Sequence, residues 1–316
     1  MTRPFEPRIP GPWPMPHLEH RTAAVQALGW APDDAHWLAL VCLHSGVFTR
    51  LQYRDWHHRD KYAARRFVQR LTAAGVAREH PLPERRTPQR FCHVFGRTLY
   101  RALGIEDANQ RRLGSPALLW RRLLTLDCLL AHPDANWLAT GEDKLLYFLK
   151  RGYDEEDLPQ RRLGDRALDH VTLHPIAVDE RCVSFVFPDA GQGTTRALYY
   201  WASDHLFLWE ALRLDGIEVE VIVAVRDDRA RNLYEETLFR WTPAGAGLNE
   251  DERSFLKAIQ AARRHPDPDE LGKWLGWEEA DDIEARLRPR LHRPPARIDR
   301  YAIHFAERLD DSDIGL

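Results

Sequence analysis

Residues 49–96 restrict the fold more than any other part of the chain, because their capping residues and turns predict a definite order of elements. Thr49 and Asp60 each precede a run with helical spacing, and both are residue types that cap helix N-termini. Gly75 follows the second run, where a left-handed residue commonly ends a helix. Two strand-like runs come next, "VAREHPL" and "FCHVFG", separated by the turn "PERRTPQR". The pattern therefore predicts two helices followed by a hairpin.

A further helix is predicted directly before this stretch, over "APDDAHWLALVCLHSG" at residues 31–46. Asp33 or Asp34 can cap it, apolar residues recur at helical spacing, and Gly46 can end it. Three helices, a strand, a turn and a second strand follow one another in the order of a winged helix. We therefore expect a winged-helix domain over residues 31–114.

The charge of the chain is distributed unevenly. The formal net charge is -3, but residues 46–122 carry 17 Arg and Lys against 6 acidic residues, a local excess of +11. Residues 246–316 carry 12 basic and 16 acidic residues, a balance of -4. Attraction of a polyanion follows local charge rather than the total. We therefore expect the first of these regions, and not the second, to meet nucleic acid.

The predicted winged helix supplies a set of candidate DNA contacts. In such a module the third helix enters the major groove, where Arg binds guanine and Gln binds adenine, while the wing follows phosphates. The start of the second helix can hold phosphates and set the register. The alternative is that these arginines only solubilise the surface. The candidate residues are Lys61, Tyr62, Arg65, Arg66, Gln69 and Arg70 on the third helix, Thr49, Arg50, Gln52, Tyr53 and Arg54 on the second, and Arg85, Arg86 and Arg90 in the wing.

Three stretches carry a resemblance to a known family: "LVCLHSGVFTRLQYRDW", "AARRFVQRLTAAGVAREH" and "FCHVFGRTLYRALGI". Residues 31–105, about a quarter of the chain, resemble the winged-helix module of replication-relaxation-type proteins of plasmids and integrative elements. The resemblance implies a DNA-binding protein that acts on double-stranded DNA in replication, mobilisation or transcriptional control. Those proteins often pair the module with a nuclease-like α/β domain, which residues 117–242 resemble.

The central region is predicted to be that α/β domain, over residues 115–243. Ser115 and Pro116 begin a strongly apolar helix, and a second long helix over residues 194–216 lies between strand-like runs. About three strands are expected, one of them followed by a crossover helix. The long helix is apolar on several sides, so we expect it to be buried in the core and partly by another chain. The predicted fold class is α/β plus α+β.

A metal-dependent nuclease of the restriction-endonuclease-like fold is the competing interpretation. Such a site needs acidic residues to hold Mg²⁺ and a lysine to orient the attacking water. Asp179, Glu180 and Asp189 are the candidate acids, but no lysine occurs between Lys150 and Lys257. We therefore expect a silent scaffold with no enzymatic activity, no metal and no cofactor. A nucleic-acid-binding subunit of a larger nucleoprotein or defence complex is a further alternative.

The two ends of the chain complete the predicted organisation. A linker, "TPAGAGLNEDE", precedes a predicted winged-helix-like domain over residues 248–316, with three helices and a hairpin. Its would-be recognition helix, "EEADDIEARLRPRL", begins with acids that repel phosphate, so we expect it to bind a protein partner or form a homodimer. Residues 1–30 are predicted to be an extended arm.

The sequence also predicts where the protein is found. No apolar run approaches the roughly 18 to 20 residues that cross a bilayer, and the N-terminus has prolines where a signal peptide has its apolar segment. We therefore expect a cytoplasmic protein with no membrane partner. Four cysteines are scattered without a zinc-binding spacing, and they are predicted to be buried thiols.

Overall fold

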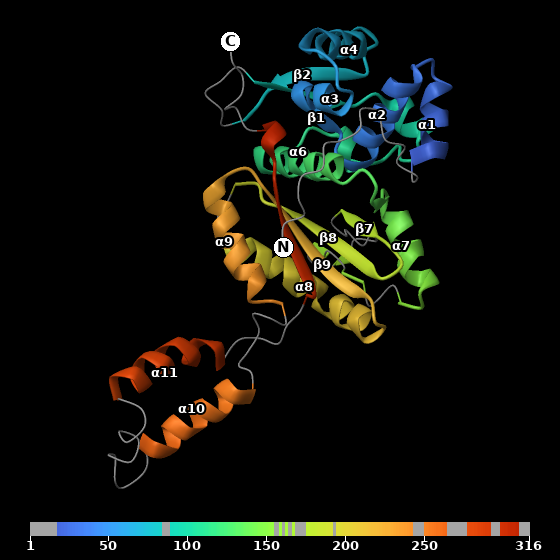
Figure 1. The fold of residues 1–316 in the computed structure, drawn as a ribbon. Coiled ribbons are helices and arrows are strands. Elements are labelled where there is room, and N and C mark those ends of the chain that lie inside the picture. Colours follow the sequence, from blue (N-terminus) through green and yellow to red (C-terminus); the bar gives the residue numbers. More distant parts are fainter. Residues whose placement is uncertain are drawn as a thin grey trace.

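The protein has a mixed α/β architecture in which helices surround two larger sheets (Figure 1). A computed structural model describes residues 18–83, 89–154, 158–159, 162–163, 166–167, 175–191, 194–242, 250–263, 277–291 and 298–309. Within these residues a three-stranded and a five-stranded sheet form, together with a two-stranded pair, β5 (Arg162–Leu163) and β6 (Arg166–Ala167). No helix in the described part of the chain is both long enough and apolar enough to cross a membrane.

The N-terminal unit contains the helices and the hairpin that were predicted for residues 31–96, and these elements are confirmed. The three-stranded sheet is antiparallel with the order β1-β3-β2. Strand β1 was not predicted, and α1 forms within the region predicted to be an extended arm. The elements are α1 (Glu19–Gln26), α2 (Pro32–His44), β1 (Val47–Thr49), α3 (Arg50–Trp56), α4 (Lys61–Ala73), β2 (Ala77–Pro81), β3 (Arg90–Val94) and α5 (Arg97–Ala102).

Local chemistry explains where these helices begin and end. Thr49 and Gln52 form a capping box at α3, in which each side chain accepts the other residue's backbone N–H. Asp60 caps α4 by accepting the backbone N–H of Ala63 at 2.6 Å. Gly75 has φ +68° directly after α4, as predicted. The start of α2 differs from the prediction, since its N-cap is Ala31, with Pro32 in the first turn in place of an Asp33 or Asp34 cap.

The five-stranded sheet has the order β10-β9-β8-β7-β4, so it is larger than the three strands expected. The pairs β4–β7 and β7–β8 are antiparallel, whereas β8–β9 and β9–β10 are parallel. Only the second strand along the chain, β7, therefore runs against the other four. The strands are β4 (Asn136–Leu138), β7 (Ile176–Val178), β8 (Cys182–Pro188), β9 (Glu218–Val225) and β10 (Arg300–Phe305).

Helices cover both faces of this sheet. The apolar helix predicted after Ser115 is α6 (Pro116–Ala131), which contacts β8 and β9 from the side of the N-terminal unit. The predicted long helix is α8 (Thr195–Leu214), which packs on the opposite face beside α9 (Asp228–Phe239). Helix α7 (Gly141–Lys150) contacts the edge strand β4. Two single turns of 3-10 helix, η2 (Asn109–Arg111) and η5 (Glu307–Leu309), complete the connections.

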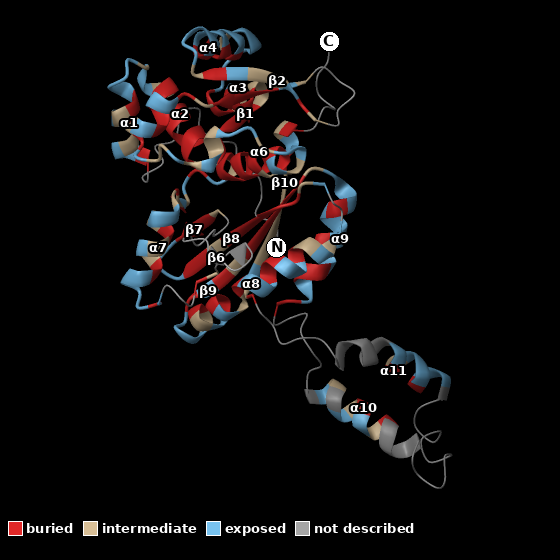
Figure 2. Ribbon diagram, turned by 180° about the vertical axis from the view of Figure 1, so that it is seen from behind, coloured by how far each residue is buried: buried red, intermediate tan, exposed pale blue. Residues whose placement is uncertain are grey.

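One continuous core joins the N-terminal unit to the five-stranded sheet. Trp120 and Leu123 on α6 belong to the same buried cluster as Trp37 on α2 and as Val186 and Ile222 on the sheet. Figure 2 shows buried residues along α6 between the two units. The four cysteines are buried and free, as expected. One core therefore includes residues on both sides of the predicted domain boundary at residue 114.

The C-terminal region differs most from its prediction. Helices α10 (Glu250–Arg263) and α11 (Trp277–Leu291) form where helices were expected, and they pack through Ile259 and Ala280. The predicted hairpin is wrong, because the single described strand there is β10, which pairs in parallel with β9. Residues 248–316 are therefore not a separate winged-helix-like domain: α10 and α11 form an insertion before the last strand of the sheet (Figure 1). The second of the three helices predicted for this region, "DPDELGKWLGW" at residues 267–277, lies almost wholly outside the described residues.

A buried carboxylate joins the end of the chain to its N-terminal unit. Asp127 on α6 is fully buried, and its Oδ2 lies 3.0 Å from Nε2 of His304 on β10. Its Oδ1 lies 3.6 Å from Nη1 of Arg308 on η5. Gln52 on α3 donates through Nε2 to Asp127 at 3.4 Å and to the carbonyl of Leu123 at 3.0 Å. Three segments distant in sequence, namely α3, α6 and the end of the chain from β10 to η5, therefore meet at Asp127.

We predict that Asp127→Asn lowers the free energy of unfolding by about 3 kcal/mol, because Arg308, whose side chain is only 19% exposed, loses its counter-charge. Urea denaturation measures the change. Asp107→Asn provides the control, since Asp107 is exposed and forms no described ion pair, and it is expected to change stability by less than about 0.5 kcal/mol. Equal, small effects of the two substitutions would show that the Asp127 contacts are not stabilising.

Two buried histidines make the stability depend on pH. Burial lowers the pKa of His57 to about 4, helped by the nearby charge of Arg59. Burial in the core beneath α8 likewise lowers the pKa of His205 to about 4. The unfolded chain takes up these protons near pH 6.5, whereas the folded chain resists protonation down to about pH 4. This contribution to stability is therefore present above pH 6.5 and is lost as the pH falls towards 4.

We predict that His205→Gln flattens the pH dependence of stability. As the pH falls from 6.5 to 5, each of the two histidines should lower the free energy of unfolding of the wild type by about 2 kcal/mol. The variant should lose less than the wild type over that interval, when both are measured by denaturation at a series of pH values. His20→Gln, at an exposed position, is the control and should retain the wild-type slope. A slope in His205→Gln as steep as in the wild type would contradict this account.

Candidate nucleic-acid interface

Helix α4 presents one polar face outward. Its Ala64, Phe67, Val68 and Leu71 are buried against the N-terminal unit. At about 100° per residue, the exposed polar residues other than Arg70 fall within an arc of roughly 140° on the opposite side. Figure 1 shows α4 at the end of the molecule remote from the five-stranded sheet. We call this surface the α4 outer face, and it consists of Lys61, Tyr62, Arg65, Arg66 and Gln69, all of them exposed.

No carboxylate in the described part of the chain neutralises the positive charges of the α4 outer face. Across the described residues, no ion pair joins Lys61, Arg65 or Arg66 to a carboxylate. Lys61 instead places Nζ over the ring of Tyr62, 5.6 Å from its centroid. Three cations concentrated on one exposed helix face can meet an external anion without first breaking an internal ion pair.

Three other arginines of the N-terminal unit, on α5 and before α4, are paired with acids. Arg97 and Arg101 on α5 both bond to Glu106. Their hydrogen bonds, that of Arg101 more than that of Arg97, lower the pKa of the Glu106 carboxyl to about 2. Arg59 lies 2.9 Å from Asp33. The contrast sets the α4 outer face apart from an ordinary arginine-rich surface, in which acids and bases are interspersed.

Arg70 has a different role from the other α4 candidates. Its guanidinium donates to Asp34 of α2 and lies 5.7 Å from the ring centroid of Phe67. Asp34 is buried and also accepts the hydroxyl of Tyr53 at 2.9 Å. The Tyr53 ring stacks on Phe67, with 4.2 Å between centroids. Arg70 therefore connects α4 to α2 and α3, and this contact orients the α4 outer face.

The predicted phosphate contacts of α3 are mostly corrected by the structure. Gln52 and Tyr53 have 0% and 2% of their surface exposed, so neither is available to DNA. Thr49 is also buried, with its side chain used as the cap. Arg50 and Arg54 are more accessible but are paired, Arg50 with Glu79 at 2.5 Å and Arg54 with Asp55 at 2.9 Å. These side chains pack or pair because α3 lies between α4 and α6.

The predicted wing is only partly described. Arg85 and Arg86 lie outside the described residues. Arg90 begins β3 and is exposed, with Nη2 donating to the carbonyl of Glu79 at 3.4 Å. Arg78, an exposed residue of β2 that the sequence interpretation missed, lies on the paired strand. Burial, and then the charges of Arg78 and Arg90, lower the pKa of His80 on this hairpin.

The acids proposed for a nuclease do not meet in one place. Asp179 occupies the turn before β8, where its Oδ1 accepts the backbone N–H groups of Arg181 and Cys182 at 2.7 and 2.6 Å. Asp189 follows the other end of β8, is buried, and accepts the N–H of Gly191 at 3.2 Å. A strand of that length separates the two carboxylates by about 20 Å, at a rise of about 3.3 Å per residue. They cannot hold the same metal ion.

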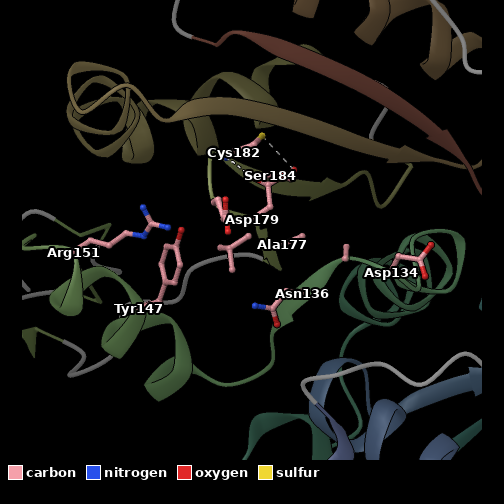
Figure 3. Close-up of a pocket in the computed structure, with 11 residues that line it drawn as sticks. Asp134, Asn136, Tyr147, Arg151, Ala177, Asp179, Cys182 and Ser184 are labelled. Carbon is pink, nitrogen blue, oxygen red and sulfur yellow. Dashed lines mark hydrogen bonds between the residues drawn. The ribbon is translucent and has the colours of Figure 1, made fainter.

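A cavity of about 560 Å³ lies beside Asp179 (Figure 3). Tyr147 projects into it from α7, with a buried hydroxyl that finds no hydrogen-bond partner among the described residues, and Arg151 packs on the Tyr147 ring at 4.7 Å. Burial and the charge of Asp179 raise the pKa of Tyr147. No group of three or more His, Cys, Asp or Glu within the described residues could hold a metal ion. The lining residues are Asp134, Ala135, Asn136, Tyr147, Arg151, Ala177, Val178, Asp179, Glu180, Cys182 and Ser184.

Comparisons with known proteins do not add to this picture. Neither the family models, nor the curated proteins, nor the solved structures contain a match to this chain. The functional interpretation therefore depends on the chain's own geometry.

We predict that Tyr53→Phe lowers the free energy of unfolding by about 1 to 2 kcal/mol, because Asp34 loses a buried hydrogen-bond donor. Denaturant titration measures the loss. Tyr62→Phe removes the same hydroxyl from the next helix, where 59% of the residue is exposed, and it should leave stability unchanged. If both variants were as stable as the wild type, the hydrogen bond between Tyr53 and Asp34 would not be what holds α3 to α2.

Proposed function

We propose that this protein binds double-stranded DNA through the α4 outer face, as a non-enzymatic winged-helix protein of mobile-element or plasmid type. The order α2, β1, α3, α4, β2, β3 and the sheet order β1-β3-β2 support this interpretation. In a winged helix the third helix enters the major groove, and α4 is the third helix of this series. The observation that carries the proposal is that this helix presents three exposed cations on one face, with no ion pair to any of them among the described residues.

The composition of the α4 outer face suits a duplex. Arg65 and Arg66 can each donate two hydrogen bonds to guanine or to phosphate, and Gln69 can pair with adenine. Lys61, in the first turn, offers a point charge to the phosphate backbone. Arg78, an exposed residue of the β2–β3 hairpin with no described ion pair, extends positive charge beside the helix, whereas Arg90 lies 3.9 Å from Glu79. We assign both base reading and phosphate contact to α4, and phosphate contact to the hairpin.

The five-stranded sheet acts as a scaffold in this proposal. Its single reversed strand is compatible with the nuclease-like resemblance of the sequence. Asp179 and Asp189 lie at opposite ends of β8, and no lysine lies between residues 150 and 257 to orient a water molecule. These observations support DNA binding without cleavage. Replication, mobilisation and transcriptional control all remain compatible roles.

We predict that Arg65→Ala/Arg66→Ala weakens binding to duplex DNA about tenfold to a hundredfold at moderate salt. Loss of two phosphate contacts should also flatten the slope of log K against log salt by about 2. Fluorescence anisotropy at several salt concentrations measures both quantities. Arg97→Ala/Arg101→Ala is the matched control, since it removes two exposed arginines that are already paired with Glu106, and its binding should remain within about twofold of the wild type.

Unchanged binding in Arg65→Ala/Arg66→Ala, or no binding by the wild type, would show that these arginines only solubilise the surface. Two further assays address the competing functions. Stronger competition by structured RNA than by duplex DNA would favour a subunit of a nucleoprotein complex. Mg²⁺-dependent cleavage of the bound DNA would favour a nuclease.

A further inference from the structure

The long helix α8 exposes large apolar side chains on the side that faces away from the sheet. Tyr200, Phe207 and Leu214 have 60%, 64% and 83% of their surface exposed. They recur every seven residues and fall within an arc of roughly 40°. We call these three residues the α8 stripe. The opposite side of the helix is buried on the sheet through Leu198, Trp201, Ala202, His205, Leu208, Trp209 and Leu212.

The α8 stripe has the spacing of a helix-pairing seam. In a coiled coil, the residues at one position of the heptad contact the partner helix, and a second position three or four residues away completes the seam. Tyr200, Phe207 and Leu214 occupy the first position. Arg196, Ser203 and Glu210 occupy the second, and all three are exposed. Apolar residues thus alternate with polar ones along the same line, over nearly the full length of the helix.

We propose that the α8 stripe is the surface through which two copies of this chain form a homodimer, with their α8 helices antiparallel. A two-fold interface uses the same patch on both subunits, so each seam must complement itself. Parallel pairing would place Arg196 against Arg196 and Glu210 against Glu210. Antiparallel pairing places Arg196, near the start of one helix, opposite Leu214 and one turn from Glu210, near the end of the other, and it also opposes the helix dipoles.

The proposed homodimer leaves the α4 outer face free. Helix α8 covers the face of the five-stranded sheet opposite to α6, and α6 lies on the side of the N-terminal unit. Figure 2 shows exposed and buried residues interspersed along α8. Pairing there buries the exposed apolar area without covering α4. This inference does not depend on DNA binding, and it replaces the predicted dimerisation through the C-terminal region.

The oligomeric state of the full chain tests the proposal. Sedimentation velocity over a wide range of protein concentrations should show a dimer that dissociates on dilution. Phe207→Glu/Leu214→Glu should be monomeric throughout and should keep the wild-type circular dichroism spectrum, because both positions are exposed in the monomer. Leu146→Glu/Leu149→Glu makes the same change at exposed leucines of α7, and this control should remain dimeric. A monomeric wild type, or a dimeric stripe variant, would overturn the proposal.

Disulfide cross-linking tests the direction of pairing. Mixed Arg196→Cys and Leu214→Cys chains should form a disulfide-linked dimer, since antiparallel seams bring the start of one helix to the end of the other. Tyr200→Cys alone should not, because two copies of residue 200 would lie about 15 Å apart along the helices. The native cysteines are buried and do not compete. Efficient cross-linking of Tyr200→Cys, with none in the mixture, would overturn the antiparallel arrangement.

Discussion

The buried carboxylate of Asp127 is the contact on which the relation between the two units of this protein depends. A charge removed from water is tolerated only where partners surround it. Here the partners are His304, Arg308 and Gln52, which come from the last strand, the turn after it and α3. Satisfying one carboxylate therefore requires the C-terminal strand, α6 and the N-terminal unit to meet. The apolar core along α6 then surrounds this polar contact.

A second polar contact determines what α4 presents to solvent. Asp34 accepts hydrogen bonds from Tyr53 and Arg70, so a buried carboxylate of α2 holds both α3 and α4. With Phe67 and Leu71 anchored in the core, the opposite side of α4 must face outward. The cations there have no described internal partner, whereas those of α5 are neutralised by Glu106. The same stretch of sequence thus contains arginines that serve the fold and arginines left free for a ligand.

The candidate interface could be predicted in part. Helical spacing between Lys61 and Ala73 identifies the exposed face of α4, since an amphipathic pattern distinguishes the buried side from the solvated side. The same reasoning failed for Gln52 and Tyr53. Polar residues near the start of a helix look available for phosphate. Here Gln52 instead donates a hydrogen bond to Leu123 and Tyr53 donates one to Asp34, residues far away in the chain. No local pattern in the sequence distinguishes the two cases. The α8 stripe could be predicted only in part, because its heptad spacing is visible in the sequence but its exposure to solvent is not.

Short-range chemistry accounts for the elements, while long-range contacts account for their assembly. The caps at Thr49 and Asp60, the glycine after α4 and the spacing of apolar residues specify helices through interactions within a few residues, so these elements were predicted correctly. The strand that pairs with β10 could not be predicted from such short-range interactions. Its sequence suits a hairpin or a sheet edge equally well, because a strand can satisfy its hydrogen bonds with any neighbour. It pairs with β9, across the α10–α11 insertion, because that position brings His304 to the buried charge of Asp127.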